Sequence, residues 1–168
     1  MTEHVGGIVV GVDGSEASVA ALQWAAEQAR AFGTWVLAVH AWEPVTTAGF
    51  APYAPTAGRP TAADQRERAA ELLASTVRAA FGPHLDTDLR AVVEEGAPAR
   101  VLLRHARSGL LLALGRTTHG RWELPAIGTV GRECLRHATV PVVTVPAPAR
   151  QPALLRAGTS AVVRSGAA

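Results

Sequence analysis

The stretch GGIVVGVDGS, residues 6–15, decides the fold class of this chain. It contains a short β-branched run closed by turn residues, without the alternation of apolar and polar side chains expected of a half-exposed strand. A continuous apolar run of this kind is typical of a parallel strand that is buried on both faces. The sequence therefore predicts an interior parallel strand that ends in a polar turn.

The sequence that follows alternates between helical and strand patterns. Ser15 is placed to cap a helix in which apolar residues recur at helical spacing, and Gly33 provides its stop. Thr61 and Asp64 resemble a capping box that opens a helix running to about Phe81. Further strands are predicted at residues 34–42, 88–96, 109–115 and 140–145, and further helices from Pro98 to about His105 and from about Thr129 to His137. This alternation predicts a Rossmann-like α/β fold, a five-stranded parallel sheet with helices on both faces.

Length and composition favour one globular domain. The 168 residues suffice for one core, and 48% apolar with 18% charged residues is the composition of a soluble domain. We expect that domain to span residues 1–146, interrupted by a long irregular loop at residues 43–59. Residues 147–168 lack a clear apolar period, so they are predicted to be a basic, disordered C-terminal tail.

The charged residues exclude several kinds of site. All 16 basic side chains are arginine, so a lysine-tipped phosphate loop, a Schiff-base lysine and a lysine general base are excluded. The tail holds three arginines and no acid, which leaves 13 arginines against 14 acids, a net charge of −1, in the rest of the chain. Nucleic acid binding is therefore not expected.

The cysteine and hydropathy patterns exclude further kinds of site and classes of protein. Cys134 is the only cysteine, so neither an intrachain disulfide nor a cysteine zinc cluster is possible, and we expect no metal site. Asp13 and Ser15 lie close together, but no histidine is placed to complete a catalytic triad with them. No apolar run approaches the roughly 18 residues of a membrane span, and the N-terminus lacks the pattern of a signal peptide. A cytoplasmic protein without membrane association is the expectation.

Two turns of unusual composition point to a binding site. In an open parallel sheet, ligands bind outside the carboxyl ends of the strands, where the strand order reverses. The turn after the first strand offers Asp13 as an acceptor for a ribose hydroxyl or an adenine amino group. After the fourth strand, Gly115 would let a ligand approach the backbone. Gly128 and Thr129 would offer N–H groups and a hydroxyl at a helix N-terminus, which favours an anion.

Five segments carry a family resemblance. They are VGVDGSE (residues 10–16), ALQWA (21–25), HAWEP (40–44), the glycine pattern from Gly115 to Gly128-Thr129, and HATVPVVTV (137–145). In this order and spacing the chain resembles the universal stress protein family from residue 8 to residue 145. The resemblance implies the strand order 3-2-1-4-5 and a homodimer formed partly through the last strand. It also implies that an adenine nucleotide, ATP with Mg²⁺, occupies the crevice described above.

The resemblance further implies which positions contact the nucleotide. Asp13 matches the acidic residue at the end of strand one, and Ala41 matches the strand-two position whose backbone faces adenine. The late motif contributes Gly115, Gly128, Thr129 and, through its backbone amide, Val130.

Thr118 departs from the family pattern, which has a glycine at this position. A β-branched residue is disfavoured at positive φ, so one reading is that the loop has a different shape. The other reading is that φ is negative and the threonine hydroxyl lines the pocket. Arg116 and Arg121 either neutralise phosphate or are solvated, and the sequence leaves both readings open.

The sequence is compatible with three functions. The first is a stress-response or signalling module that binds an adenine nucleotide. The alternative is a dimeric interaction protein of the same fold that has lost nucleotide binding. Thr118, in place of the family's glycine, favours this alternative. An enzyme comes last, because no nucleophile, metal cluster or catalytic lysine is evident, although weak ATP hydrolysis stays open. We expect His40 to be a packed, hydrogen-bonded side chain and Cys134 to pack as an apolar residue beside Val130.

Overall fold

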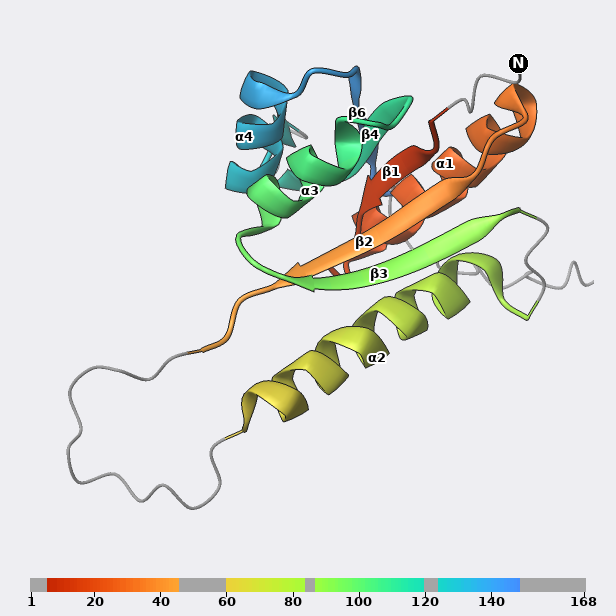
Figure 1. Ribbon diagram of the computed structural model, residues 1–168. Helices are drawn as coiled ribbons and strands as arrows, with labels where there is room; N and C mark the ends of the chain where they lie inside the picture. The colour runs from red at the N-terminus through yellow and green to blue at the C-terminus, as the bar shows by residue number, and fades with distance from the viewer. Residues whose placement is uncertain (1–5, 46–59, 84–86, 120–123, 149–168) are drawn as a thin grey trace, which may run out of the picture.

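The computed structural model describes residues 6–45, 60–83, 87–119 and 124–148, and over these ranges strands and helices alternate (Figure 1). The strands are β1 (Ile8–Gly11), β2 (Val36–Trp42), β3 (Leu89–Glu95), β4 (Leu111–His119), β5 (Leu124–Ala126) and β6 (Val142–Pro146). The helices are α1 (Glu16–Phe32), α2 (Ala62–Phe81), α3 (Pro98–Ala106) and α4 (Thr129–His137).

Within the described ranges, the parallel sheet has the order β3-β2-β1-β4-β6. Val10 of β1 is in register with Ala38 of β2 on one side and Ala113 of β4 on the other, so β1 is an interior strand. Because β6 is the fifth parallel strand in chain order, the order 3-2-1-4-5 that the resemblance implied is confirmed. The order reverses between β1 and β4.

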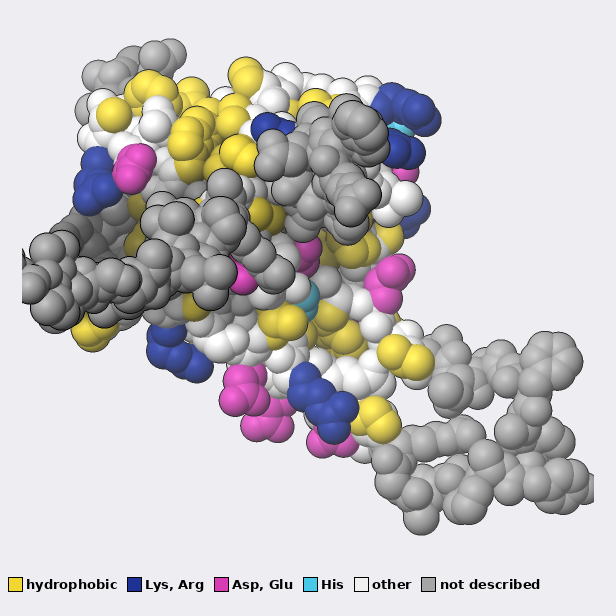
Figure 2. All heavy atoms as spheres, turned by 180° about the vertical axis from the view of Figure 1, so that it is seen from behind, with side chains coloured by type: hydrophobic (Ala, Val, Ile, Leu, Met, Phe, Trp, Pro, Cys, Tyr) yellow, Lys and Arg dark blue, Asp and Glu magenta, His cyan; other side chains and the backbone are white. Residues whose placement is uncertain are grey.

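Strand β1 is buried on both of its faces, which explains the continuous apolar run at residues 8–10. Ile8 and Val10 pack in a cluster with residues of α1 and α2, whereas Val9, between them, packs with residues of α3 and α4. In Figure 1, α3 and α4 accordingly lie together on one side of the sheet. On the face seen from behind, basic and acidic side chains are both scattered over the surface (Figure 2).

The helix boundaries follow local signals in the sequence. Ser15 caps α1 by accepting a hydrogen bond from the Ser18 backbone N–H, and Gly33 ends the helix with a left-handed φ of 64°. Thr61 and Asp64 form the reciprocal capping box of α2. These predictions are confirmed. The sequence could support them because a cap depends only on residues within one turn of the helix end.

The segment after residue 115 differs from the prediction. Strand β4 does not end at Gly115 but continues to His119, and β5 pairs with this extension in an antiparallel ladder. In that ladder Thr118 is in register with Pro125. Threonine suits an extended strand, so the TTH run continues the strand where a loop was expected. Residues 120–123, which include Arg121, lie outside the described residues, as do the tail from residue 149 and residues 46–59 of the predicted irregular loop.

Helix α3 is fixed to the edge of the sheet by Glu94 of β3. One carboxylate oxygen of Glu94 lies 2.6 Å from Nε2 of His105, and the other makes a salt bridge with Arg104. Partial burial and the charge of Arg104 lower the pKa of His105, and Nε2–H is the donor in this contact because a carboxylate oxygen accepts. This contact holds α3 against the sheet at the side where the pocket described next is formed.

Candidate functional site

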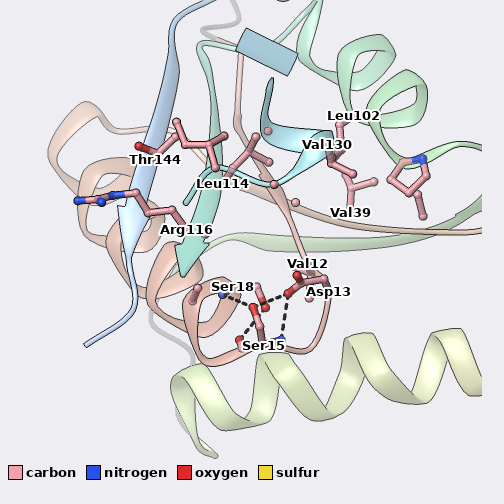
Figure 3. A pocket seen from close by; sticks show the side chains of 18 of the residues that line it. Val12, Asp13, Ser15, Ser18, Val39, Leu102, Leu114, Arg116, Val130 and Thr144 are labelled. Carbon is pink, nitrogen blue, oxygen red and sulfur yellow. Dashed lines mark hydrogen bonds between the residues drawn. The ribbon is translucent and has the colours of Figure 1, made fainter. Parts of the chain in front are cut away.

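A pocket of about 290 Å³ opens at the carboxyl ends of β1, β2 and β4, where the strand order reverses (Figure 3). Six segments line it: the turn after β1 with the start of α1, the end of β2, the first two turns of α3, the end of β4, the start of α4 and the middle of β6. Six of the seven sequence-predicted binding residues line this pocket: Asp13, Ala41, Gly115, Gly128, Thr129 and Val130.

The turn after β1 holds the Asp13 carboxylate in a fixed position. Gly14 has a φ of 84°, which glycine adopts readily and which lets the chain turn into α1. The backbone N–H of Ser15 donates to Asp13 Oδ1 at 3.0 Å, and the Ser15 hydroxyl donates to the same oxygen at 2.6 Å. Burial raises the pKa of Asp13, but the hydrogen bonds from Ser15 and Ser18 together lower it by more than burial raises it. The pKa of Asp13 is therefore below its ordinary value. The pocket therefore holds an ionised carboxylate at neutral pH.

The N-terminus of α4 forms the opposite wall of the pocket. Gly128, the N-cap residue, has φ −62° and ψ 173° and makes no side-chain cap. The first N–H groups of the helix, at Thr129, Val130 and Gly131, have no partner within their own helix because they belong to its first turn. A Cβ atom added at Gly128 would meet nothing within 4 Å. This helix end can therefore receive an anion, which its N–H groups and dipole both favour.

Gly115 has a packing reason to be glycine. A Cβ atom there would lie 2.5 Å from the backbone carbon of Ala17 and 2.7 Å from the backbone nitrogen of Ser18. The end of β4 thus contacts the first turn of α1 directly. The sequence assigned this glycine to the approach of a ligand, whereas the structure shows that it brings α1 close to the sheet.

The end of β2 supplies the apolar side of the pocket. His40 is half-buried, and its Nδ1 donates to the backbone oxygen of Val12 at 2.7 Å, because a carbonyl oxygen can only accept. The interpretation of His40 as a packed, hydrogen-bonded side chain is confirmed. Ala41 follows it, and Val39 precedes it, and both line the pocket. An apolar wall of this kind suits one face of a planar base.

Several lining residues, most of them apolar, were not found from the sequence. Pro98 and Leu102, one turn apart on α3, line the pocket together with Leu114 of β4 and Thr144 of β6. Leu102 is only 4% exposed and also belongs to the core cluster with Val9. A pocket-lining leucine follows the same helical period as a core leucine, so the sequence carries no separate signal for it.

Arg116 is the cationic side chain among the described lining residues. In Figure 3 its side chain extends from β4 across β6, away from Asp13. The side chains of Thr117, Thr118 and His119 lie outside the described part of the chain, as does Arg121. Thr118 itself has an extended backbone in the β4–β5 ladder, so it does not occupy a left-handed turn.

Cys134 faces the core behind the pocket. It is fully buried in the cluster that includes Val9 and Leu102, and Val130 packs against the same cluster, as predicted. Burial, with a smaller contribution from Glu133, raises the pKa of its thiol to about 11.

In the described ranges no group of three or more His, Cys, Asp or Glu side chains could hold a metal ion, and no described helix is long and apolar enough to cross a membrane.

Comparisons with known sequences agree on one family. The model of the universal stress protein family matches residues 6–146. A universal stress protein of Mycolicibacterium smegmatis is 30% identical over 138 residues, which cover 82% of this chain and 45% of the relative. One from Mycobacterium bovis is 33% identical over 139 residues, covering 81% of this chain and 44% of the relative. The chain spans about half the length of the curated relatives it matches.

Solved structures show the same fold. A universal stress protein family protein from Arabidopsis thaliana with AMP bound has a TM-score of 0.55 at 20% identity, over 88% of this chain and 97% of that chain. The universal stress protein from Archaeoglobus fulgidus in complex with dAMP has a TM-score of 0.52 at 19% identity, over 85% of this chain and 99% of that chain.

Proposed function

The chain belongs to the universal stress protein family. We propose that it binds an adenine nucleotide in the pocket between the turns after β1 and β4, and that ATP is the preferred ligand. Nucleotide occupancy would be the signal through which it acts as a stress-response or signalling module. The two structures solved with AMP and dAMP share its fold, which supports this proposal.

One observation carries the proposal. A single pocket combines an ionised carboxylate at Asp13, an apolar wall at the end of β2 and a helix N-terminus without a side-chain cap at Gly128. A nucleotide has the matching groups: donors on the base and the ribose, a flat apolar base and an anionic phosphate. In this arrangement adenine lies against Ala41, and the phosphates accept hydrogen bonds from the backbone of Thr129 and Val130.

Mg²⁺ would enter with the nucleotide. The described pocket offers one carboxylate, Asp13, and one hydroxyl near the phosphate position, Thr129, as hard oxygen ligands. Such a donor set fits an ion that keeps phosphate oxygens and water as its main ligands, because Mg²⁺ is commonly held in this way. It does not fit a metal held by protein ligands alone.

We further propose that the protein senses nucleotide without turning it over, in the cytoplasm, as a homodimer. Asp13 is engaged by Ser15, and no described side chain is arranged as an activated nucleophile beside the α4 N-terminus.

Among the described strands, β6 pairs with β4 alone, so its other edge is available for a second copy. Light scattering should give twice the 17.4 kDa mass of the chain, and a mass of one chain would contradict the dimer.

A dimeric interaction protein without nucleotide binding is the second candidate. It is favoured by Thr118, which takes the place of a motif glycine and continues β4 into an antiparallel ladder. Substitution of Thr118 by glycine tests this argument: tighter nucleotide binding would show that the threonine in the β4–β5 ladder restricts binding. Unchanged affinity would remove that explanation.

Calorimetric titration tests the proposal. ATP, AMP and cyclic AMP, each with and without Mg²⁺, should give saturable heat with the parent protein. Asp13→Asn should weaken binding about tenfold or more, because a hydrogen bond to a charged group contributes about 1.5–3 kcal/mol. Asp88→Asn is the matched control, because Asp88 is an exposed carboxylate at the opposite end of the sheet, beside Arg90. Absence of heat at millimolar nucleotide would reject the proposal.

A further inference from the structure

Ser15 connects the candidate ligand group to the first helix. Its hydroxyl donates to Asp13 Oδ1 at 2.6 Å and accepts a hydrogen bond from the Ser18 backbone N–H at 3.1 Å. Figure 3 shows the Ser15 hydroxyl between the Asp13 carboxylate and the start of α1. Because a hydroxyl has one hydrogen, donation to Asp13 and acceptance from Ser18 together fix its orientation.

These contacts also fix the carboxylate. Both hydrogen bonds from Ser15, through its backbone N–H and its hydroxyl, end on the same oxygen of Asp13, Oδ1. Two donors on one oxygen restrict the rotation of the carboxylate about its side-chain bonds. The other oxygen, Oδ2, then has a set direction in a residue that lines the pocket.

The frame that holds Ser15 is itself rigid. Ser18 is 1% exposed, and its hydroxyl donates to the backbone oxygen of Ser15 at 2.9 Å. Close contact of Gly115 with the backbone of Ala17 and Ser18 anchors this turn against β4. The position of Ser15, and through it that of Asp13, is therefore determined by the packing of α1 on the sheet.

We propose that Ser15 is a positioning residue for nucleotide recognition, which holds the Asp13 carboxylate so that Oδ2 accepts a hydrogen bond from the ligand. This inference rests on the proposed function, since it concerns the same pocket. Its consequence is a link between the first helix and the site: the residue that caps α1 also sets the ligand acceptor. Loss of the hydroxyl should therefore change Asp13 even when no ligand is present.

Three variants separate positioning from helix capping. Ser15→Ala removes both hydroxyl hydrogen bonds and keeps the backbone N–H to Asp13. Ser15→Thr retains a hydroxyl and should restore the parent behaviour. Thr61→Ala is the matched control, because Thr61 makes the same kind of cap on α2 and does not line the pocket.

The first measurement needs no nucleotide. A pH titration of the Asp13 carboxyl carbon by NMR should show a higher pKa in Ser15→Ala than in the parent, because a donor to the ionised form is lost. Ser15→Thr and Thr61→Ala should leave the pKa of Asp13 unchanged. The other charged or titratable side chains on the pocket wall, His40 and Arg116, are the same in all variants.

The second measurement is the affinity for AMP and for ATP. Ser15→Ala should bind about three- to tenfold more weakly, as expected for loss of one hydrogen bond, with Ser15→Thr within about twofold of the parent. If Ser15→Ala leaves both the Asp13 pKa and the affinity unchanged while Asp13→Asn still weakens binding, the positioning role is wrong and the proposed function stands. If the parent protein binds neither nucleotide, the proposed function fails, and the recognition role of Ser15 fails with it.

Discussion

The substitution Gly115→Ala should destabilise the fold. The Cβ atom of the alanine would lie 2.5 Å from the carbonyl carbon and 2.6 Å from the carbonyl oxygen of Ala17, and 2.7 Å from the nitrogen of Ser18. All three atoms belong to the backbone of the first turn of α1, so no side-chain rotation relieves the contact. Either α1 or the end of β4 must move.

The expected size of the effect follows from this geometry. Carbon atoms in contact prefer separations of about 3.5–4.0 Å, so the helix would have to move by about 1 Å. Overpacking of a close-packed interior typically destabilises a protein by about 1–3 kcal/mol. We expect the upper half of that range, because the contact is with backbone and because Ser18, at the same turn, is only 1% exposed.

Urea denaturation measures this change against a glycine of the same pocket. Gly128→Ala is the control, since a Cβ atom there meets nothing within 4 Å and φ is −62°. Its stability should stay within about 1 kcal/mol of the parent, because the lower entropy of the unfolded chain offsets the poorer N-cap. Equal stability of Gly115→Ala and the parent protein would refute the close approach of α1 to β4.

The remaining predictions concern three titratable side chains. Cys134 should resist alkylation at pH 8 in the folded protein and react rapidly in urea, because the thiol is buried with a pKa of about 11; fast reaction of the folded protein would contradict its placement. The pKa of Asp13 is lowered on folding, so its ionised form stabilises the protein above the pKa of the unfolded chain and this contribution is lost as pH falls through the folded pKa. The loss of stability in Asp13→Asn should accordingly shrink in acid, and a loss independent of pH in urea titrations would disprove the linkage. Glu94→Gln should destabilise by about 1 kcal/mol at low salt and less at high salt, since the salt bridge with Arg104 is partly exposed; denaturation curves at two ionic strengths give the comparison.

Local signals explain how much of the fold could be predicted. The caps at Ser15 and Thr61 and the proline at the start of α3 act within one helical turn, and each helix begins where they indicated. The buried run at residues 8–10 is apolar on both sides because β1 has helices over both faces. Such features require no knowledge of distant residues.

Two features at the end of β4 were not predicted: the extension of the strand and the packing reason for Gly115. Gly115 reads as the end of a strand, since glycine is common in turns. Its contact partner, Ala17, lies at the start of α1, and only the folded structure shows that glycine is needed there for packing. Past Gly115 the strand continues with threonines, which suit extended backbone, and pairs with β5 in an antiparallel ladder.

The pocket, like the fold, could be predicted from the sequence only in part. Its polar parts, Asp13 and Gly128, stand out as unusual turn residues beside buried strands, and the structure brings both to one pocket. Its apolar wall at Val39, Leu102 and Leu114 was missed, because these residues follow the periods of ordinary core positions. Apolar ligand-contacting residues are distinguished from core residues only by an open space beside them, which the sequence does not encode locally.

The most direct test of nucleotide binding is an NMR titration of the ¹⁵N-labelled protein with AMP and with ATP plus Mg²⁺. Nucleotide binding in this pocket should give saturable shifts of the backbone amide signals of Asp13, Gly128, Thr129 and Val130, with little change at Asp88 on the opposite end of the sheet. Amide signals that stay in place at millimolar nucleotide, or shifts confined to residues outside this pocket, would contradict it.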